Sequence, residues 1–180
     1  MTRWLMTLPL IILAALAILF AGYALHHDPH VIPKALVGKT LPDLTLASLD
    51  EGAAVEIRLR DELKQGPVIV NFFASWCGPC ALEQPALLAL KARGVRIVGI
   101  DYEDAPPRGS AEAARTFLAR TGDPFARRLV DPDGRAGIEF GLTGVPESYL
   151  VAQDGRILAK YTNLDERDVG EVSTRLLTAR

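Results

Sequence analysis

The chain of 180 residues contains two cysteines, three positions apart in the run Trp76-Cys77-Gly78-Pro79-Cys80. An apolar run at 67–73 ends just before them and a helical pattern begins just after, so both sulfurs lie at a predicted strand-to-helix turn. A helix N-terminus carries unpaired N–H groups and partial positive charge, which stabilise a thiolate. The pattern therefore predicts a redox pair in which Cys77 attacks from the exposed cap and Cys80 lies better buried, one turn further on. Gly78 is expected to permit a tight turn, and Pro79 is tolerated because the first helical turn has no hydrogen bond for it to remove.

Two other kinds of Cys-x-x-Cys site fit the sequence less well. A zinc site needs four ligands, and the three histidines, His26, His27 and His30, lie far upstream. A static disulfide across so short a loop would remove little chain entropy. We therefore expect no metal and no cofactor other than a redox-active Cys77–Cys80 disulfide.

The N-terminal segment has no charged residue from Trp4 to Leu25. At a rise of roughly 1.5 Å per residue, residues 4–25 match a hydrocarbon core of about 30 Å. Arg3 precedes the segment, which favours a cytoplasmic N-terminus with the rest of the chain outside. A cleaved signal peptide is the alternative, since Gly22-Tyr23-Ala24 is a passable cleavage site, but the apolar run is longer than usual for one. We expect a transmembrane anchor at 1–25, a linker at 26–35 and a globular domain at 36–180.

Composition excludes two classes of protein. The 20 basic and 22 acidic side chains give a net charge of -2, so nothing indicates nucleic acid binding. Two cysteines cannot build the disulfide framework of a small secreted domain. Both thiols are available for one site.

The order of apolar patterns predicts an α/β sandwich with a mixed sheet. Strands are expected as a hairpin at 41–46 and 54–57, as buried strands at 67–73 and 95–100, at 129–130, and as a second hairpin at 149–151 and 156–159. Asp154-Gly155 suggests a type I′ turn in that second hairpin. Helices are expected at 79–93, with Leu82, Leu87 and Leu90 on the apolar face, at 110–120 with Ser110 as N-cap, at 135–140 and at 165–180.

The residues around the cysteines resemble the thioredoxin superfamily. The five-residue motif looks like the thioredoxin active site, Pro85 falls where that family kinks its active-site helix, and Thr143-Gly144-Val145-Pro146 resembles its cis-proline segment. Within the superfamily the chain is most similar to the membrane-anchored CcmG/DsbE type used in cytochrome c maturation. The residues that carry this likeness are 71–77, Glu83, 99–102 and 141–148, and the resemblance covers roughly residues 36 to 178.

The resemblance implies a thioredoxin fold with an N-terminal β-hairpin and a central helical insert, preceded by one transmembrane helix. It implies a single-pass protein of the bacterial inner membrane whose periplasmic domain reduces disulfides of apocytochrome c or its haem chaperone. A membrane thiol reductant of the DsbD/CcdA kind would supply the electrons. The Gly78-Pro79 dipeptide, shared with thioredoxin, and the acidic neighbours Glu83 and Glu147 favour a reductant over an oxidant.

The resemblance also assigns roles around the cysteines. Asn71 stands where thioredoxin has a buried Asp that assists deprotonation, and because Asn71 cannot take a proton, Glu83 is favoured as proton acceptor over a solvated helix residue. The substrate-binding residues would be Val145, Pro146, Glu147 and Tyr102. A cis Pro146 would present the Val145 backbone to an extended substrate strand, and Glu147 would either add negative charge near the thiols or face solvent. Asp101 and Glu103 replace Asn and Lys of the resembled pattern, which suggests a more acidic groove, although a solvated charge run is the alternative.

Other functions remain open. A general periplasmic oxidase or isomerase would use the same cysteines, and a redox-inert scaffold of this fold would not need them. A copper-handling protein would need a histidine near the cysteines, and none follows residue 30. A peroxidase would need a different environment for its reactive cysteine.

Overall fold

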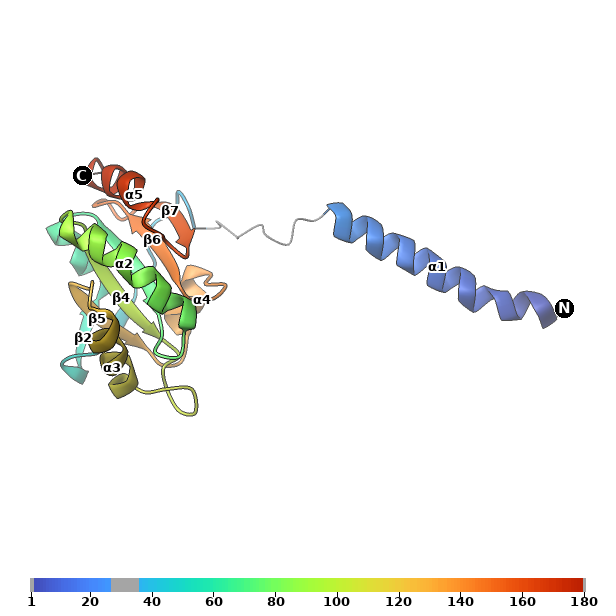
Figure 1. The fold of residues 1–180 in the computed structure, drawn as a ribbon, viewed down its shortest axis with the longest axis horizontal. Helices are drawn as coiled ribbons and strands as arrows, with labels where there is room; N and C mark the ends of the chain where they lie inside the picture. The colour runs from blue at the N-terminus through green and yellow to red at the C-terminus, as the bar shows by residue number, and fades with distance from the viewer. Residues whose placement is uncertain (1, 27–35, 180) are drawn as a thin grey trace. The chain divides into compact units, whose positions relative to one another are not determined.

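The computed structural model describes residues 2–26 and 36–179, in two compact units with the boundary between Pro33 and Lys34. The first unit contains the helix α1 (Thr2–His26), which covers the segment predicted as an anchor (Figure 1). Across the two described ranges, no helix is both long and apolar enough to cross a membrane.

A seven-stranded mixed sheet forms the centre of the second unit (Figure 1). Its strand order is β2-β1-β5-β4-β3-β6-β7, with β3 parallel to β4, β4 parallel to β5 and the other pairs antiparallel. The strands are β1 (Thr45–Ser48), β2 (Gly52–Arg58), β3 (Val68–Phe73), β4 (Arg96–Tyr102), β5 (Arg127–Asp131), β6 (Glu147–Val151) and β7 (Ile157–Thr162). The predicted α/β architecture with a mixed sheet is confirmed.

Helices cover both faces of this sheet. They are α2 (Gly78–Ala92), α3 (Ala111–Thr121), α4 (Arg135–Phe140), α5 (Val169–Leu177) and a 3₁₀ helix (Leu59–Gln65). Residues of α2, α3 and α5 pack into one apolar cluster, here called the α2-side cluster. The 3₁₀ helix and α4 contribute to a second cluster on the opposite face, here called the α4-side cluster.

Strand β3 separates the two clusters, and all six of its residues are buried. Ile69 and Phe73 lie in the α2-side cluster, whereas Val68, Val70 and Phe72 lie in the α4-side cluster. A strand covered on both faces needs apolar side chains in both directions, which explains the unbroken run in the sequence. Asn71, the polar exception, faces the α2 side.

Element boundaries differ most from the predictions at the starts of the first hairpin strand and of the C-terminal helix. The first strand of the N-terminal hairpin begins at Thr45, because Leu41 is drawn into the α4-side cluster. The C-terminal helix begins at Val169 and not at 165, since Asp165 N–H donates to Asp168 Oδ2 in a preceding turn (3.0 Å). The predicted N-cap of α3 is confirmed, with Ser110 Oγ accepting from Ala113 N–H (3.1 Å).

The type I′ turn predicted between β6 and β7 is wrong. Gly155 has a φ of 91°, but Asp154 does not share the positive φ that a type I′ turn requires at both central residues. Gly155 N–H donates to the Ala152 carbonyl (2.9 Å), so the glycine occupies the fourth position of the turn and not the third. Asp154 Oδ1 accepts from Arg156 N–H (2.8 Å), a local bond that favours this arrangement.

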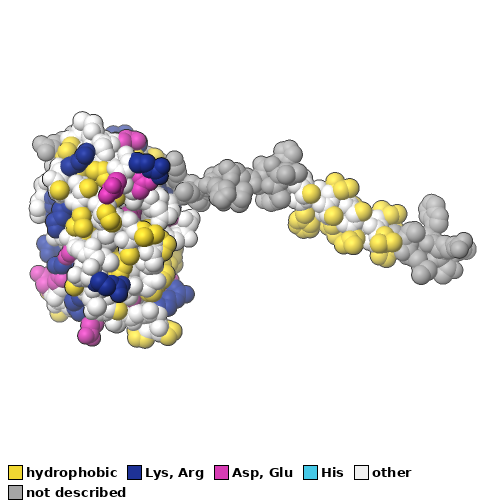
Figure 2. Space-filling model, in the orientation of Figure 1, with side chains coloured by type: hydrophobic (Ala, Val, Ile, Leu, Met, Phe, Trp, Pro, Cys, Tyr) yellow, Lys and Arg dark blue, Asp and Glu magenta, His cyan; other side chains and the backbone are white. Residues whose placement is uncertain are grey.

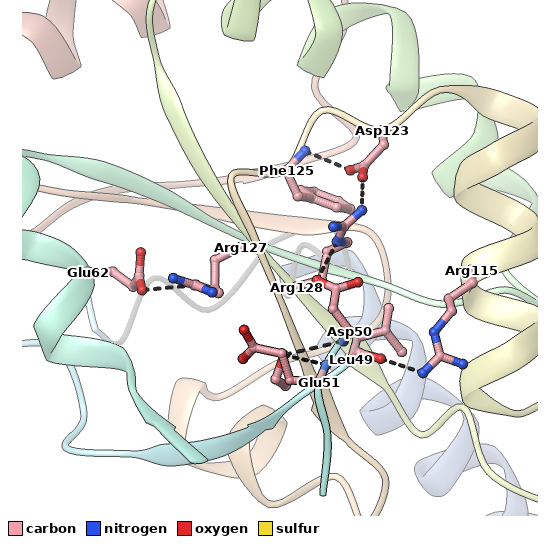
Figure 3. Close-up of polar contacts among 10 residues, drawn as sticks. Leu49, Asp50, Glu51, Glu62, Arg115, Asp123, Phe125, Arg127 and Arg128 are labelled. Carbon is pink, nitrogen blue, oxygen red and sulfur yellow. Dashed lines mark hydrogen bonds and ion pairs between the residues drawn. The ribbon is translucent and has the colours of Figure 1, made fainter. Parts of the chain in front are cut away.

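Polar contacts fix the N-terminal hairpin against β5 and α3 (Figure 3). Arg128 of β5 donates to Asp50 at the hairpin turn (2.9 Å) and also pairs with Asp123, while Arg115 of α3 donates to the Leu49 carbonyl. The hairpin therefore extends the sheet at the edge far from β6 and β7, and leaves the carboxyl end of β3 free for the cysteine turn.

Candidate active site

Cys77 and Cys80 are joined by a disulfide at the start of α2. Cys77 is the N-cap residue, and its Sγ accepts from Cys80 N–H (3.1 Å), while Cys77 N–H donates to the Ala74 carbonyl just after β3 (3.2 Å). The strand-to-helix turn therefore delivers both sulfurs to the helix N-terminus, whose N–H groups and dipole favour a thiolate on Cys77 after reduction.

Cys77 is less exposed than the sequence suggests. Its exposed fraction is 4%, against 1% for Cys80, because both sulfurs belong to the α2-side cluster. The neighbours form an exposed rim, with Trp76 42% exposed and Gly78 and Pro79 also at the surface. The expectation of an exposed cap sulfur is therefore wrong in degree, although Cys77 remains the more accessible of the two.

Gly78 is not required by the backbone. Its φ lies outside the left-handed region, and a Cβ added there would meet no heavy atom within 4 Å. The turn is made at Cys77, which has extended backbone angles, so the predicted tight turn at Gly78 is wrong. What the glycine leaves is open space beside the disulfide.

A second correction concerns the apolar face of α2. Leu87 and Leu90 are buried as predicted, but Leu82 is 82% exposed. Position 82 follows Cys80 by two residues, and positions two apart in a helix point in different directions. Leu82 thus adds to the apolar surface on the first turns of the helix.

Glu83 and Asn71 form a buried polar pair behind the disulfide. Asn71 Nδ2 donates to Glu83 Oε2 (3.1 Å) and to Ser148 Oγ (2.9 Å), and Glu83 Oε1 accepts from Leu164 N–H (2.9 Å). Glu83 is therefore not a solvated helix residue. Burial raises the pKa of Glu83 to about 7, although its two hydrogen bonds act in the opposite direction. Glu83 lies one turn after Cys80, and its carboxyl group can exchange a proton near neutral pH.

This pKa gives a stability prediction for Glu83→Gln. Below pH 4.5 Glu83 is protonated in both states, and between pH 4.5 and about 7 the folded state holds a proton that the unfolded state has released. The free energy of unfolding of the wild type should therefore fall relative to that of the variant as pH rises through that window. Above the window the difference between the two proteins should stay constant. Urea unfolding of both proteins across the window measures the difference. A difference independent of pH would contradict the raised pKa.

The segment before β6 lies against the α2-side cluster, which contains the disulfide. The Val145–Pro146 peptide bond is cis, and the Val145 side chain is half-buried and packs against both apolar clusters. Pro146 is buried and the preceding residues, Thr143 and Gly144, are exposed. Val145 therefore lies at the edge between the α2-side cluster and the surface.

Glu147 neither faces solvent nor points toward the thiols. It is fully buried on the α4 side, where it pairs with Lys160 Nζ (2.9 Å) and accepts from Tyr149 OH (3.0 Å) and from Thr143. Alternation along β6 gives Ser148 to the Asn71 side and Glu147 to the other. The charge of Glu147 is thus compensated by Lys160 across the sheet from the disulfide.

Tyr102 also lies on the α4 side. Its ring packs edge-on against Phe72, with centroids 6.5 Å apart, and its OH donates to Glu103 Oε1 (3.1 Å). Asp101, the preceding residue, is buried on the α2 side, and Glu103 pairs with Arg108. The expected acidic groove is therefore wrong for Asp101, because alternation along β4 turns its carboxyl inward.

Sequence reasoning missed three contacts around the site. Asp104 accepts two hydrogen bonds from Ser75, Arg108 lies over the Trp76 ring (5.8 Å to the centroid), and Lys160 pairs with Glu147. Each joins residues far apart in the chain. The only available signal was the acidic run after β4, which is more often a solvated loop.

Comparison with known proteins agrees with this geometry. The redoxin family model matches residues 36–176. The thiol:disulfide interchange protein HelX of Rhodobacter capsulatus is 38% identical over 172 residues, covering 94% of this chain and 92% of its own length. The thiol:disulfide interchange protein DsbE of Escherichia coli K12 is 35% identical over 181 residues, covering 98% and 90%.

Solved structures share the fold at lower identity. A secreted thiol-disulfide isomerase from Corynebacterium glutamicum matches with a TM-score of 0.65 at 22% identity, covering 84% of this chain and 96% of that one. A secreted Mycobacterium tuberculosis disulfide oxidoreductase matches with a TM-score of 0.62 at 21% identity, covering 74% and 96%. The family match, the relatives and the disulfide at the start of α2 lead to one conclusion: this chain belongs to the redoxin family, in the DsbE/CcmG branch of the thioredoxin superfamily, and is a thiol-disulfide oxidoreductase.

Proposed function

We propose that this oxidoreductase is a membrane-tethered reductant on the extracytoplasmic side, acting during cytochrome c maturation. The observation that carries the reductant direction is Glu83, a buried carboxyl group one turn after Cys80 that can take a proton near neutral pH. A negative charge there disfavours a thiolate on either cysteine. The reduced pair is then less stable and gives up its electrons more readily.

The reaction begins with the reduced pair. The Cys77 thiolate attacks one sulfur of a partner disulfide, that S–S bond breaks, and the other partner sulfur leaves and takes a proton. Cys80 then gives its proton to Glu83 and attacks the Cys77 sulfur, which releases the first partner sulfur as a thiolate that is protonated in turn. Two electrons and two protons reach the partner, and Cys77–Cys80 becomes the disulfide. Asn71 orients Glu83 and does not itself take the proton.

The exposed rim supports a polypeptide substrate. Trp76, next to Cys77, and Leu82, two residues after Cys80, are exposed apolar side chains, and the open space at Gly78 lets a chain approach. An extended segment would pair with the Val145 backbone, so that a partner sulfur reaches Cys77. The relatives are named as thiol:disulfide interchange proteins, and the resemblance to the cytochrome c maturation type supports the Cys-x-x-Cys-His of apocytochrome c, or its haem chaperone, as substrate. A membrane thiol reductant of the DsbD/CcdA kind would regenerate the pair.

The proposed location rests on the N-terminal segment. Residues 4–25 carry no charge, and the apolar side chains of α1 that the structure describes, among them Ile18 and Phe20, are exposed (Figure 2). An uncleaved anchor is expected to keep the full-length chain in the membrane fraction after alkaline extraction. The globular domain should be digested by protease added to the periplasmic side of the membrane. Release as a shortened soluble protein would favour a cleaved signal peptide.

Partner capture tests the substrate. In Cys80→Ala the mixed disulfide on Cys77 cannot be resolved, so a partner should accumulate in a covalent complex that is sensitive to dithiothreitol. The variant is expected to capture apocytochrome c or a haem-handling protein. Cys77→Ser combined with Cys80→Ala is the matched control and should capture nothing. If the captured proteins have no role in cytochrome c maturation, the substrate assignment fails while the reaction class stands.

A further inference from the structure

The turn that leads from β3 to Cys77 is held by a side chain from the loop that follows β4. Asp104 is buried, and its carboxylate accepts from Ser75 N–H (2.7 Å) and from Ser75 Oγ (2.8 Å). Ser75 precedes Cys77 by two residues. The position of the attacking sulfur thus depends on a carboxylate outside the cysteine motif.

A second carboxyl group lies behind the first. Asp101 is buried and hydrogen-bonded to Asp104, and no partner reaches its Oδ1 within the described ranges. Two adjacent buried carboxyl groups cannot both ionise cheaply, so one proton is held between them. Burial and the neighbouring Asp104 raise the pKa of Asp101 to about 9, which assigns that proton to Asp101 at neutral pH.

The same loop touches the active site a second time. Arg108 lies over the Trp76 ring, 5.8 Å from its centroid, and pairs with Glu103. Gly109 lets the loop pass close to Asp104, since a Cβ at that position would lie 1.5 Å from Asp104 Oδ1. Residues 103–109, here called the clamp loop, therefore contact both Ser75 and Trp76.

We propose that Asp101 is a positioning residue for disulfide exchange. Its carboxylic acid proton, donated to Asp104, keeps the clamp loop on Ser75 and Trp76, and loss of that proton releases the loop. A second negative charge beside Asp104 would remove the donor and repel the carboxylate that binds Ser75. The inference goes beyond the proposed function, because it requires only that Cys77 attack disulfides and does not depend on the partner.

The charges around Asp101 are few. Its sheet neighbours, Phe73 in β3 and Val130 in β5, are apolar, and α3 contributes Phe117 and Ala114 to the same side. From α2, Glu83 is committed to Asn71 and Leu164, and Cys77 and Cys80 titrate only when reduced. On the clamp loop, Arg108 pairs with Glu103. Tyr102 lies across the sheet, and burial raises its pKa above the ordinary value, so it titrates after Asp101.

Trp76 fluorescence provides the test. The full chain carrying Trp4→Phe has Trp76 as its one tryptophan, and the oxidised protein has no titrating thiol. Fluorescence is measured from about pH 7 to about pH 11, a range that includes the ordinary pKa values of lysine and tyrosine side chains. The parent should show a transition near pH 9, which Asp101→Asn should lack, because its amide donates to Asp104 at every pH. The same transition in Asp101→Asn, or none in the parent, would overturn the proposal.

Two further variants separate positioning from general stability. Ser75→Ala should lose part of the amplitude at Trp76, because it removes the Ser75 Oγ bond to Asp104 and keeps the Ser75 N–H bond. Gly109→Ala should show at neutral pH the signal that the parent reaches only at high pH, because its Cβ displaces Asp104. The matched control Gly170→Ala, with only Arg93 at 4.0 Å from the new Cβ, should titrate like the parent. Full amplitude in Ser75→Ala would contradict the clamp.

The functional readout is the rate at which reduced protein attacks a small aromatic disulfide. The parent and Asp101→Asn should react equally at neutral pH. Above the transition the parent should become about tenfold slower than the variant, because a displaced nucleophile loses its attack geometry. Equal rates at all pH values would show that Asp101 does not position Cys77.

Discussion

Cys77→Ser is expected to reduce the rate of disulfide exchange to that of the buffer without protein. The serine hydroxyl at the start of α2 has no thiolate form near neutral pH, so no mixed disulfide forms with a partner. Cys80 cannot substitute, because it is almost fully buried and lies inside the first helical turn. The rate is measured by reduction of a model protein disulfide under a steady supply of reductant.

The comparison with Cys80→Ser makes this prediction specific. Both substitutions remove the disulfide and leave the same number of hydroxyl and thiol groups, yet Cys80→Ser should still form the first mixed disulfide while Cys77→Ser should not. Equal loss of that first step in the two variants would mean that the roles of the two sulfurs are not as assigned. Exchange by the parent no faster than by Cys77→Ser would indicate a redox-inert scaffold.

Lys160→Met is expected to have the largest effect on stability. Lys160 pairs with Glu147 across β7 and β6, and both side chains are almost completely removed from solvent. Removing one member of a buried pair leaves the other charge without compensation, which costs about 3–5 kcal/mol. The loss should appear as a lower urea midpoint of the full chain in mild detergent, followed by near-ultraviolet circular dichroism.

An exposed pair supplies the matched control. Arg58 and Asp43 form a similar ion pair, but about half of each side chain is exposed, so Arg58→Met should leave the midpoint almost unchanged. Adding Glu147→Gln to Lys160→Met should recover part of the loss, because it removes the uncompensated charge. If the single and double variants are equally unstable, the cost comes from lost packing and not from the charge.

The loss of stability in Lys160→Met should include the segment before β6. Glu147 also accepts from Thr143, and Lys160 Nζ reaches the Gly141 carbonyl (3.3 Å), so the pair fixes both ends of the segment that leads to Val145. This gives Glu147 a physical role beside Pro146 that does not require its charge to act on the thiols.

The chemistry of the site could be predicted because it lies within a short stretch of chain. A strand of apolar residues followed by a helix with cysteines at its N-terminus is specified by local periodicity, and the disulfide depends on residues three apart. The mixed sheet and the two hairpins follow from the same local patterns. The errors of boundary and turn type at Thr45, Val169 and Gly155 arose where a side chain contact or a hydrogen bond decided between close alternatives.

The environment of that chemistry could not be predicted from local patterns. Glu147 and Tyr102 were assigned to the substrate site by resemblance but lie on the far side of the sheet from the disulfide, because alternation assigns faces only after the register is known. The partners of Glu83, Asp104 and Glu147 come from residues 81, 29 and 13 positions away. The sequence by itself determined which atoms exchange electrons. Only the tertiary structure decided which carboxyl groups are buried near them, and burial, which sets whether a proton is held or released, is a property of the folded chain.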